Sequence, residues 1–193
     1  MLMPEWLLAL AAIMALPPQS GDAVPDEATQ RQVLEQSYAY FRAKDGGRYD
    51  RAYAMIAPSM RSYLTRELYD SESARFNAEA GKAEERRVMR LTWYRDPPEA
   101  PAPGLYVAAD FRSRFPNIYL HCGYLMWHQE PDGRFRIVRE EQSFIDKAMA
   151  ARTPPEQLAP LDNRFGCVGQ PLPAPHPGSA SNRSPLEKRP ALH

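Results

Sequence analysis

Three side chains in the second half of the chain have the types needed for acid–base chemistry: Tyr106, Asp110 and His121. A carboxylate or an imidazole can take a proton from a carbon beside a carbonyl group, and a tyrosine hydroxyl can donate a hydrogen bond to that carbonyl. Together in one cavity they could catalyse an isomerisation or a dehydration. Their positions on the predicted strands decide between catalysis and a structural role.

A metal site is the second chemistry to consider, because His121, Cys122 and His128 are all residue types that bind zinc. Neighbouring residues on a strand point to opposite faces, so His121 and Cys122 cannot easily reach one ion. We therefore expect no metal site, and no other pattern in the chain indicates a cofactor.

An apolar run from Trp6 to Leu16 marks the start of the chain. It is shorter than the roughly 20 residues that cross a bilayer, but it suits the apolar region of a secretory signal peptide. Small residues at Gly21-Asp22-Ala23 favour cleavage before Val24. We expect a signal peptide over 1–23, a periplasmic or secreted protein, and no stable membrane anchor. Because Glu5 and no basic residue precedes the run, an uncleaved membrane tether is the alternative.

Export changes the meaning of Cys122 and Cys167, the two cysteines of the chain. Thiols in an oxidising compartment tend to pair, and with two cysteines the connectivity is forced. A disulfide closing a loop of this size stabilises a fold by roughly 4 kcal/mol on the chain-entropy model. Two buried free thiols are the alternative.

Composition gives no case for a polyanionic partner. Without Glu5 and Asp22, the chain has 24 Lys and Arg residues against 22 Asp and Glu residues, a formal charge of +2. We expect no nucleic acid and no anionic lipid as partner. Most of the 20 prolines lie between Pro97 and Pro103 or from Pro154 to the end. This pattern predicts one domain over 24–169 and a disordered, proline-rich tail over 170–193.

Helical spacing of apolar residues dominates the first half of the domain. Asp26 can cap a helix that carries Val33, Leu34, Tyr38 and Phe41 and stops at Gly46-Gly47. A second, shorter helix is predicted by apolar spacing that ends before Pro58. Thr65 opens a third helix that runs toward Gly81.

Alternating apolar and polar residues follow along the chain, and this pattern predicts an antiparallel sheet. The expected strands are 88–94, 105–115, 118–128 and 135–144, with a hairpin turn at Pro131-Asp132-Gly133. The charge run Glu84-Glu85-Arg86-Arg87 is expected to be a solvated helix end or loop. Helices followed by a meander predict an α+β fold with helices packed on one face of a curved sheet.

This order of elements resembles the nuclear-transport-factor-two-like cone, also called cystatin-like. More narrowly, residues 87–144 resemble an exported bacterial family of unknown function, DUF4019. The residues that carry this resemblance are Arg87-Val88, Thr92-Trp93-Tyr94, Asp96-Pro97, Pro103-Gly104-Leu105-Tyr106, Asp110-Phe111, Phe115 and Asp132-Gly133-Arg134-Phe135-Arg136-Ile137. The cone resemblance implies a cavity that in other families houses isomerases and dehydratases.

Strand alternation indicates which side chains face that cavity. Leu105, Val107, Ala109, Phe111 and Phe115 share one apolar face, which we expect the helices to cover. Tyr106 and Asp110 then face away from the cavity, the latter near Arg112 or Arg139. His121 lies opposite Ile118, Leu120 and Tyr124 and is also expected outside, whereas Cys122 shares their covered face. A bulge would reverse this parity.

With the candidate residues outside the cavity, we expect a non-catalytic binding or structural domain of the bacterial envelope. Its partner would be a small apolar ligand or another protein. The aromatic residues of the strands also suggest a homodimer through the outer sheet face. The alternative is a small isomerase or hydro-lyase that uses Asp110, His121 and Tyr106 in the cavity.

The predicted export signal can be tested directly. Protein recovered from the envelope should begin at or near Val24, because signal peptidase selects the small residues that precede it. Intact-mass spectrometry measures this, and Met1 at the amino terminus of soluble periplasmic protein would contradict the prediction.

Overall fold

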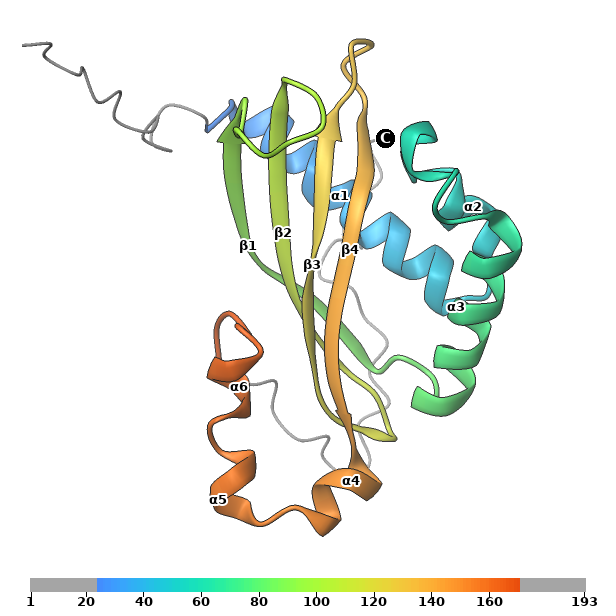
Figure 1. Cartoon of the computed structure of the whole chain (residues 1–193), viewed down its shortest axis with the longest axis vertical. Coiled ribbons are helices and arrows are strands. Elements are labelled where there is room, and N and C mark those ends of the chain that lie inside the picture. Colours follow the sequence, from blue (N-terminus) through green and yellow to red (C-terminus); the bar gives the residue numbers. More distant parts are fainter. Residues whose placement is uncertain (1–23, 171–193) are drawn as a thin grey trace, which may run out of the picture.

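The computed structural model describes residues 24–170; the predicted signal peptide over 1–23 and, apart from Gln170, the predicted tail lie outside this range. Helices α1 to α3 precede a four-stranded antiparallel sheet of order β1-β2-β3-β4, which confirms the α+β class (Figure 1). The helices are α1 (Glu27–Asp45), α2 (Tyr49–Tyr53), α3 (Arg66–Ala80), α4 (Lys147–Arg152), α5 (Pro155–Leu158) and α6 (Leu161–Arg164), with a short 3-10 helix at Pro58–Met60. The strands are β1 (Glu85–Arg95), β2 (Leu105–Arg114), β3 (Ile118–Gln129) and β4 (Phe135–Asp146).

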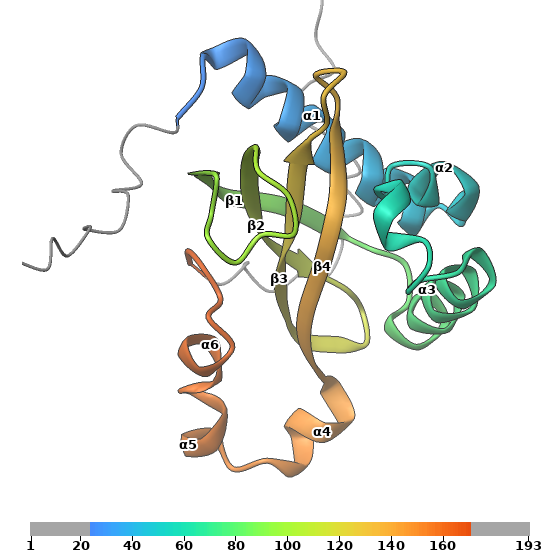
Figure 2. The same ribbon diagram turned by 45° about the horizontal axis from the view of Figure 1, so that its top comes forward.

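Figures 1 and 2 show the layers: α1 runs diagonally behind the sheet, and α2 and α3 lie beyond the β4 edge. Helices α5 and α6 are on the other side, so the sheet stands between them and α3. No helix between residues 24 and 170 has the length and apolar character that a membrane span requires.

Local capping explains where the long helices begin. The Asp26 carboxylate accepts a hydrogen bond from the Thr29 amide at 2.8 Å, and the Thr65 hydroxyl accepts one from the Leu68 amide at 3.3 Å. Each bond satisfies an amide that the first helical turn leaves without a backbone partner. Gly81, at φ 83°, ends α3 in a conformation that favours glycine. These helix ends confirm the sequence prediction.

The main core lies between α1 and the inner face of the sheet. Val33 and Phe41 of α1 are buried there as expected, and the Phe41 ring meets Phe111 of β2 edge-on at 5.0 Å. The Trp127 indole donates to the Ser37 hydroxyl at 3.1 Å, which satisfies a polar group inside the core. The predicted inner face of β2 is therefore correct.

Asp110, on the opposite face of β2, points outward as expected. Its carboxylate pairs with Arg90 of β1 at 3.0 Å, and not with Arg112 or Arg139. The register explains this, because Arg90 and Asp110 are opposite one another on adjacent strands.

The predicted parity of β3 is wrong. The pairing of β3 with β4 shifts register between Ile118 and Leu120, so a bulge separates the start of β3 from its remainder. One extra residue reverses which side chains of the strand face inward and which face outward. His121 consequently faces the interior at 2% exposure, although simple alternation places it outside.

Cys122 is buried as expected, but on the outer face, because it lies opposite Arg112 in the β2–β3 register. The segment after β4 returns to cover it, and the predicted Cys122–Cys167 disulfide is present with a Cα–Cα distance of 5.6 Å. Arg112 holds the same segment, pairing with Asp162 at 3.1 Å and donating to the Val168 carbonyl at 2.9 Å. Residues 147–170 are thus attached to the outer face by a covalent and an ionic contact.

The charge run at 84–87 is not a solvated loop, and this prediction is corrected. It enters β1, where the Arg86 side chain is 8% exposed and pairs with Asp45 at 2.6 Å. The guanidinium lies 4.7 Å from the Phe41 ring centroid and 5.0 Å from that of Phe115. Arg86 is buried because a carboxylate and two ring faces replace the water that it loses.

The two faces of β2 predict a contrast in stability. Phe111→Ala should lower the free energy of unfolding by about 3–5 kcal/mol, because it leaves a cavity against Phe41. Asp110→Ala removes a surface ion pair and should cost less than about 1 kcal/mol. Thermal and denaturant unfolding of both variants measures this difference, and equal losses would contradict the assignment of the faces.

Candidate ligand-binding groove

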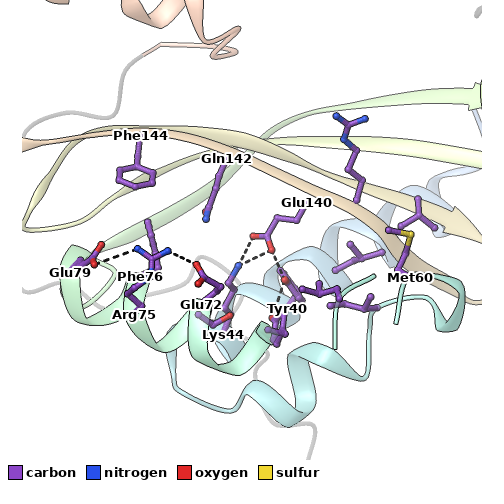
Figure 3. Close-up of a pocket in the computed structure, with 17 residues that line it drawn as sticks. Tyr40, Lys44, Met60, Glu72, Arg75, Phe76, Glu79, Glu140, Gln142 and Phe144 are labelled. Atoms are coloured by element: carbon purple, nitrogen blue, oxygen red, sulfur yellow. Dashed lines mark hydrogen bonds and ion pairs between the residues drawn. The ribbon is translucent and has the colours of Figure 1, made fainter. Parts of the chain in front are cut away.

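A groove of about 370 Å³ separates α3 from β4. Its walls come from α1, α3, the segment around the 3-10 helix and the inner face of β4 (Figure 3). Figure 3 shows Met60 at one end of the groove, Phe144 at the other, and Glu140 with Lys44 between them. The groove therefore has apolar ends and a charged centre.

A second bulge directs β4 side chains into the groove. Ile137 lies opposite Trp127 and Arg139 lies opposite Met126, so Val138 is an extra residue on β4. Alternation from Ile137 would point residues 139 and 141 inward. The extra residue instead points Glu140, Gln142 and Phe144 inward, and all three line the groove.

An ion pair between α1 and β4 forms the centre of the groove. The Lys44 ammonium donates to both carboxylate oxygens of Glu140, at 2.8 and 2.7 Å, and the Tyr40 hydroxyl donates to the same carboxylate at 2.7 Å. The Tyr69 hydroxyl of α3 donates to Tyr40 at 3.0 Å. The side chains of Lys44 and Glu140 are 8% and 17% exposed, so the pair is largely shielded from water.

These contacts set the protonation of the cluster. Burial alone would raise the pKa of Glu140, but the charge of Lys44 and the hydrogen bonds from Lys44 and Tyr40 outweigh it and lower the pKa. Burial, followed by the nearby Glu140 charge, raises the pKa of Tyr40 well above its usual value. Glu140 is therefore a carboxylate and Tyr40 a neutral phenol at neutral pH, each already bonded to a neighbour.

The ends of the groove belong to two separate apolar clusters. Met60 and Leu64 pack against the main core near Ile137, whereas Phe76 forms a smaller cluster with Phe115 and others. Phe144 is 43% exposed and meets the Phe76 ring edge-on at 5.5 Å. An aromatic side chain this exposed at the mouth of a groove is a surface that a ligand can cover.

Charges at the rim are paired with one another. Arg75 of α3 bonds to Glu72 and lies 3.6 Å from Glu79, and Arg139 of β4 bonds to Glu141 (Figure 3 shows the α3 pairs). Each charged side chain at the rim therefore lies beside one of opposite sign.

His121 lies behind the Phe76 end of the groove and does not line it. Its ring packs at 5.4 Å from Phe76 and 5.2 Å from Phe115, and its Nε2 lies 3.1 Å from the Gln142 side-chain oxygen. Its Nδ1 is buried without a hydrogen-bond partner in the described residues. Burial, assisted by the Arg86 charge, lowers the pKa of His121 to about 3.

The sheet separates the three sequence candidates. His121 is inside, whereas Tyr106 and Asp110 are on the outer face, where Tyr106 stacks on His128 at 4.4 Å and donates to the Ala102 carbonyl at 2.8 Å. The hypothetical metal ligands His121, Cys122 and His128 are likewise not brought together. Among residues 24–170, no three His, Cys, Asp or Glu side chains are grouped to hold a metal ion.

The residues of the groove centre are ones that the sequence reasoning missed. Lys44 carries a usable signal, since it follows Ser37, Tyr40 and Phe41 at helical spacing and so continues the buried stripe of α1. A lysine in such a stripe calls for a buried partner. Glu140 has no comparable signal, because strand alternation from Phe135 and Ile137 points it outward and only the bulge reverses that.

Comparison with known proteins identifies the family. The sequence model of a protein family of unknown function, DUF4019, matches residues 36–139, from α1 into β4. The chain belongs to the DUF4019 family. The match includes Tyr40, Lys44 and Tyr69 and ends one residue before Glu140. No curated protein and no solved structure matches, so the nuclear-transport-factor-two-like cone stays a prediction.

His121 predicts a pH dependence of stability. Its pKa is about 3 in the folded protein against the ordinary 6.5, so the unfolded chain binds the proton first as the pH falls. The free energy of unfolding should therefore fall from pH 6.5 toward pH 3, with a slope approaching about 1.4 kcal/mol per pH unit from this residue. In His121→Phe, which retains an aromatic ring, the slope between pH 6.5 and 5 should be smaller by about 1 kcal/mol per pH unit, because the unfolded-state histidine is only half protonated at pH 6.5. Urea unfolding across this range measures it, and an unchanged slope would contradict the buried neutral histidine.

Proposed function

We propose that this DUF4019 protein is an exported, non-catalytic binding domain of the bacterial cell envelope that binds its partner in the groove between α3 and β4. The apolar segment over 6–16 and the disulfide between Cys122 and Cys167 support an oxidising, periplasmic or secreted location.

The hydrogen-bonded, ion-paired state of Glu140 is the observation that carries this proposal. An efficient general base has a pKa near the working pH and does not have to break an ion pair to accept a proton from the substrate. Lys44 and Tyr40 together donate three hydrogen bonds to the carboxylate of Glu140, and its pKa is lowered. The carboxylate therefore organises the groove and is a poor base.

The alternative, an isomerase or hydro-lyase, would need another ionisable side chain free in the groove. Asp110 and Tyr106 lie on the opposite face of the sheet, and the low pKa of His121 keeps its ring neutral behind Phe76. These observations favour binding over catalysis.

The dimensions and walls of the groove support binding. Its volume of about 370 Å³ is within the range of sites that hold small ligands or peptide side chains, and its ends are apolar. The outer sheet face is a weaker candidate for a partner or a second copy. Residues 147–170 of the same chain cover Cys122 and Arg112 on that face, and Tyr106 is already stacked there.

Binding of Nile red, a neutral apolar dye, tests this function. The wild-type protein should bind it at one saturable site, measured by fluorescence titration. Leu64→Trp narrows the groove and should weaken binding at least tenfold, whereas Leu68→Trp, at a 46% exposed leucine that does not line the groove, should not. Thermal unfolding of both variants checks the fold.

The proposal fails if the folded wild-type protein has no saturable dye site, or if both tryptophan variants weaken binding equally. Turnover of an added carbonyl substrate that disappears in Glu140→Gln would instead support the isomerase or hydro-lyase.

A further inference from the structure

β4 is an edge strand, and part of its free edge already pairs with an extended segment of the same chain. The Ala57 amide donates to the Ile137 carbonyl, and the Ile137 amide donates to the Met55 carbonyl, both at 2.9 Å. These bonds form a parallel bridge between Ile56 and Ile137. The backbone groups of Ile137 therefore point away from β3.

The same orientation recurs further along β4. In an antiparallel pair, alternate residues point both backbone groups toward the partner strand and the others point away. Beyond the bulge at Val138, the register makes Glu140, Gln142 and Phe144 the residues that point away from β3. No described residue between 24 and 170 makes a backbone hydrogen bond to these three outside the sheet.

This free edge borders the groove. Glu140, Gln142 and Phe144 direct their side chains into the groove (Figure 3). The register points their backbone groups toward the open edge beside it. From Glu140 to Phe144 the edge is about 13 Å long at the rise of a β-strand. An extended chain on this edge would place every second side chain in the groove.

The opposite edge of the sheet differs. On β1, the Val88 amide donates to the Tyr38 hydroxyl of α1 at 3.3 Å, and Gly169 of the carboxy-terminal segment lies against Met89. Contacts from α1 and the carboxy-terminal segment thus reach β1 at Val88 and Met89. The lower half of β4 combines an open backbone edge with an adjoining groove, which is the arrangement that strand addition uses.

We propose that the occupant of the groove is an extended, uncharged peptide segment of a partner protein, which adds as a fifth strand to the edge of β4 at Glu140, Gln142 and Phe144. This inference rests on the proposed function and specifies its partner. Apolar side chains toward the two ends of the segment contact Met60 and Phe144. A small polar side chain between them lies over the Lys44–Glu140 pair. Charged side chains are disfavoured because the groove charges are already paired.

The probe is a fluorescein-labelled, end-blocked peptide, Thr-Leu-Thr-Ser-Thr-Phe-Thr, measured by fluorescence anisotropy. Two N-methylated versions of this peptide are compared with it. One is methylated on the Leu, Ser and Phe residues, and the other on the second, third and fourth Thr residues. Only one of these alternate sets can face β4 in a strand. One version should therefore bind at least tenfold more weakly than the unmodified peptide, and the other within about threefold of it.

A pair of protein variants tests the same peptide–β4 backbone hydrogen bonds by changing β4 instead of the peptide. Gln142→Pro removes an outward amide without removing a β3–β4 hydrogen bond, and Gln142→Ala removes the side chain but keeps the amide. Gln142→Ala measures what loss of the groove side chain alone costs, and peptide affinity should be at least tenfold lower in Gln142→Pro than in Gln142→Ala. The methylated peptides need only wild-type protein, so they decide the question if Gln142→Pro fails to fold.

Equal binding of the two methylated peptides, or equal effects of the two Gln142 variants, would overturn strand addition. Nile red binding without peptide binding would also overturn it and would leave the proposed function standing with a small molecule as ligand. If neither probe binds the folded protein, both proposals fail. A wild-type dimer that Gln142→Pro dissociates would identify a second copy, and not a separate partner, as the occupant.

Discussion

The ion pair between Lys44 and Glu140 is the interaction on which the arrangement of the groove depends. It joins α1 to β4 directly, and the Tyr69–Tyr40 hydrogen bond connects α3 to the same carboxylate. Because both charges are largely buried, loss of either partner would leave the other without compensation, which typically costs about 3–5 kcal/mol. One cluster therefore joins α1, α3 and β4 around the groove, and the same bonds leave Glu140 poorly suited to act as a base.

Two bulges determine which side chains reach the interior. The one near the start of β3 turns His121 inward, and the one at Val138 turns Glu140, Gln142 and Phe144 toward the groove. Regular alternation would have directed Arg139 and Glu141 there, and those two residues pair with each other at the surface. The second bulge also follows the point where Ile137 pairs with residues 55–57, so it separates a covered part of the β4 edge from an open part.

The outer face of the sheet is organised by different contacts. Arg112 and the disulfide attach residues 147–170 to it, and Asp110 pairs with Arg90. On the inner side, Arg86 is buried between aromatic rings with Asp45 as its partner. Charged residues thus stabilise both faces, but each charge has a neighbour of opposite sign. The exposed Phe144 and the free edge beside it form the surface that we propose for a partner.

The sequence by itself determined the features that depend on local spacing. The caps at Asp26 and Thr65, the four strands and the apolar face with Phe111 follow from helical and strand periodicity, and two cysteines can form a single pairing. The DUF4019 resemblance also held, since the model of that family matches residues 36–139. Only the tertiary structure decided the inward turn of His121, the burial of Arg86 and the meeting of Lys44 with Glu140. The physical reason is that one bulge residue inverts a strand's faces, and that a buried charge is stable only beside a partner, here 96 residues away in the chain.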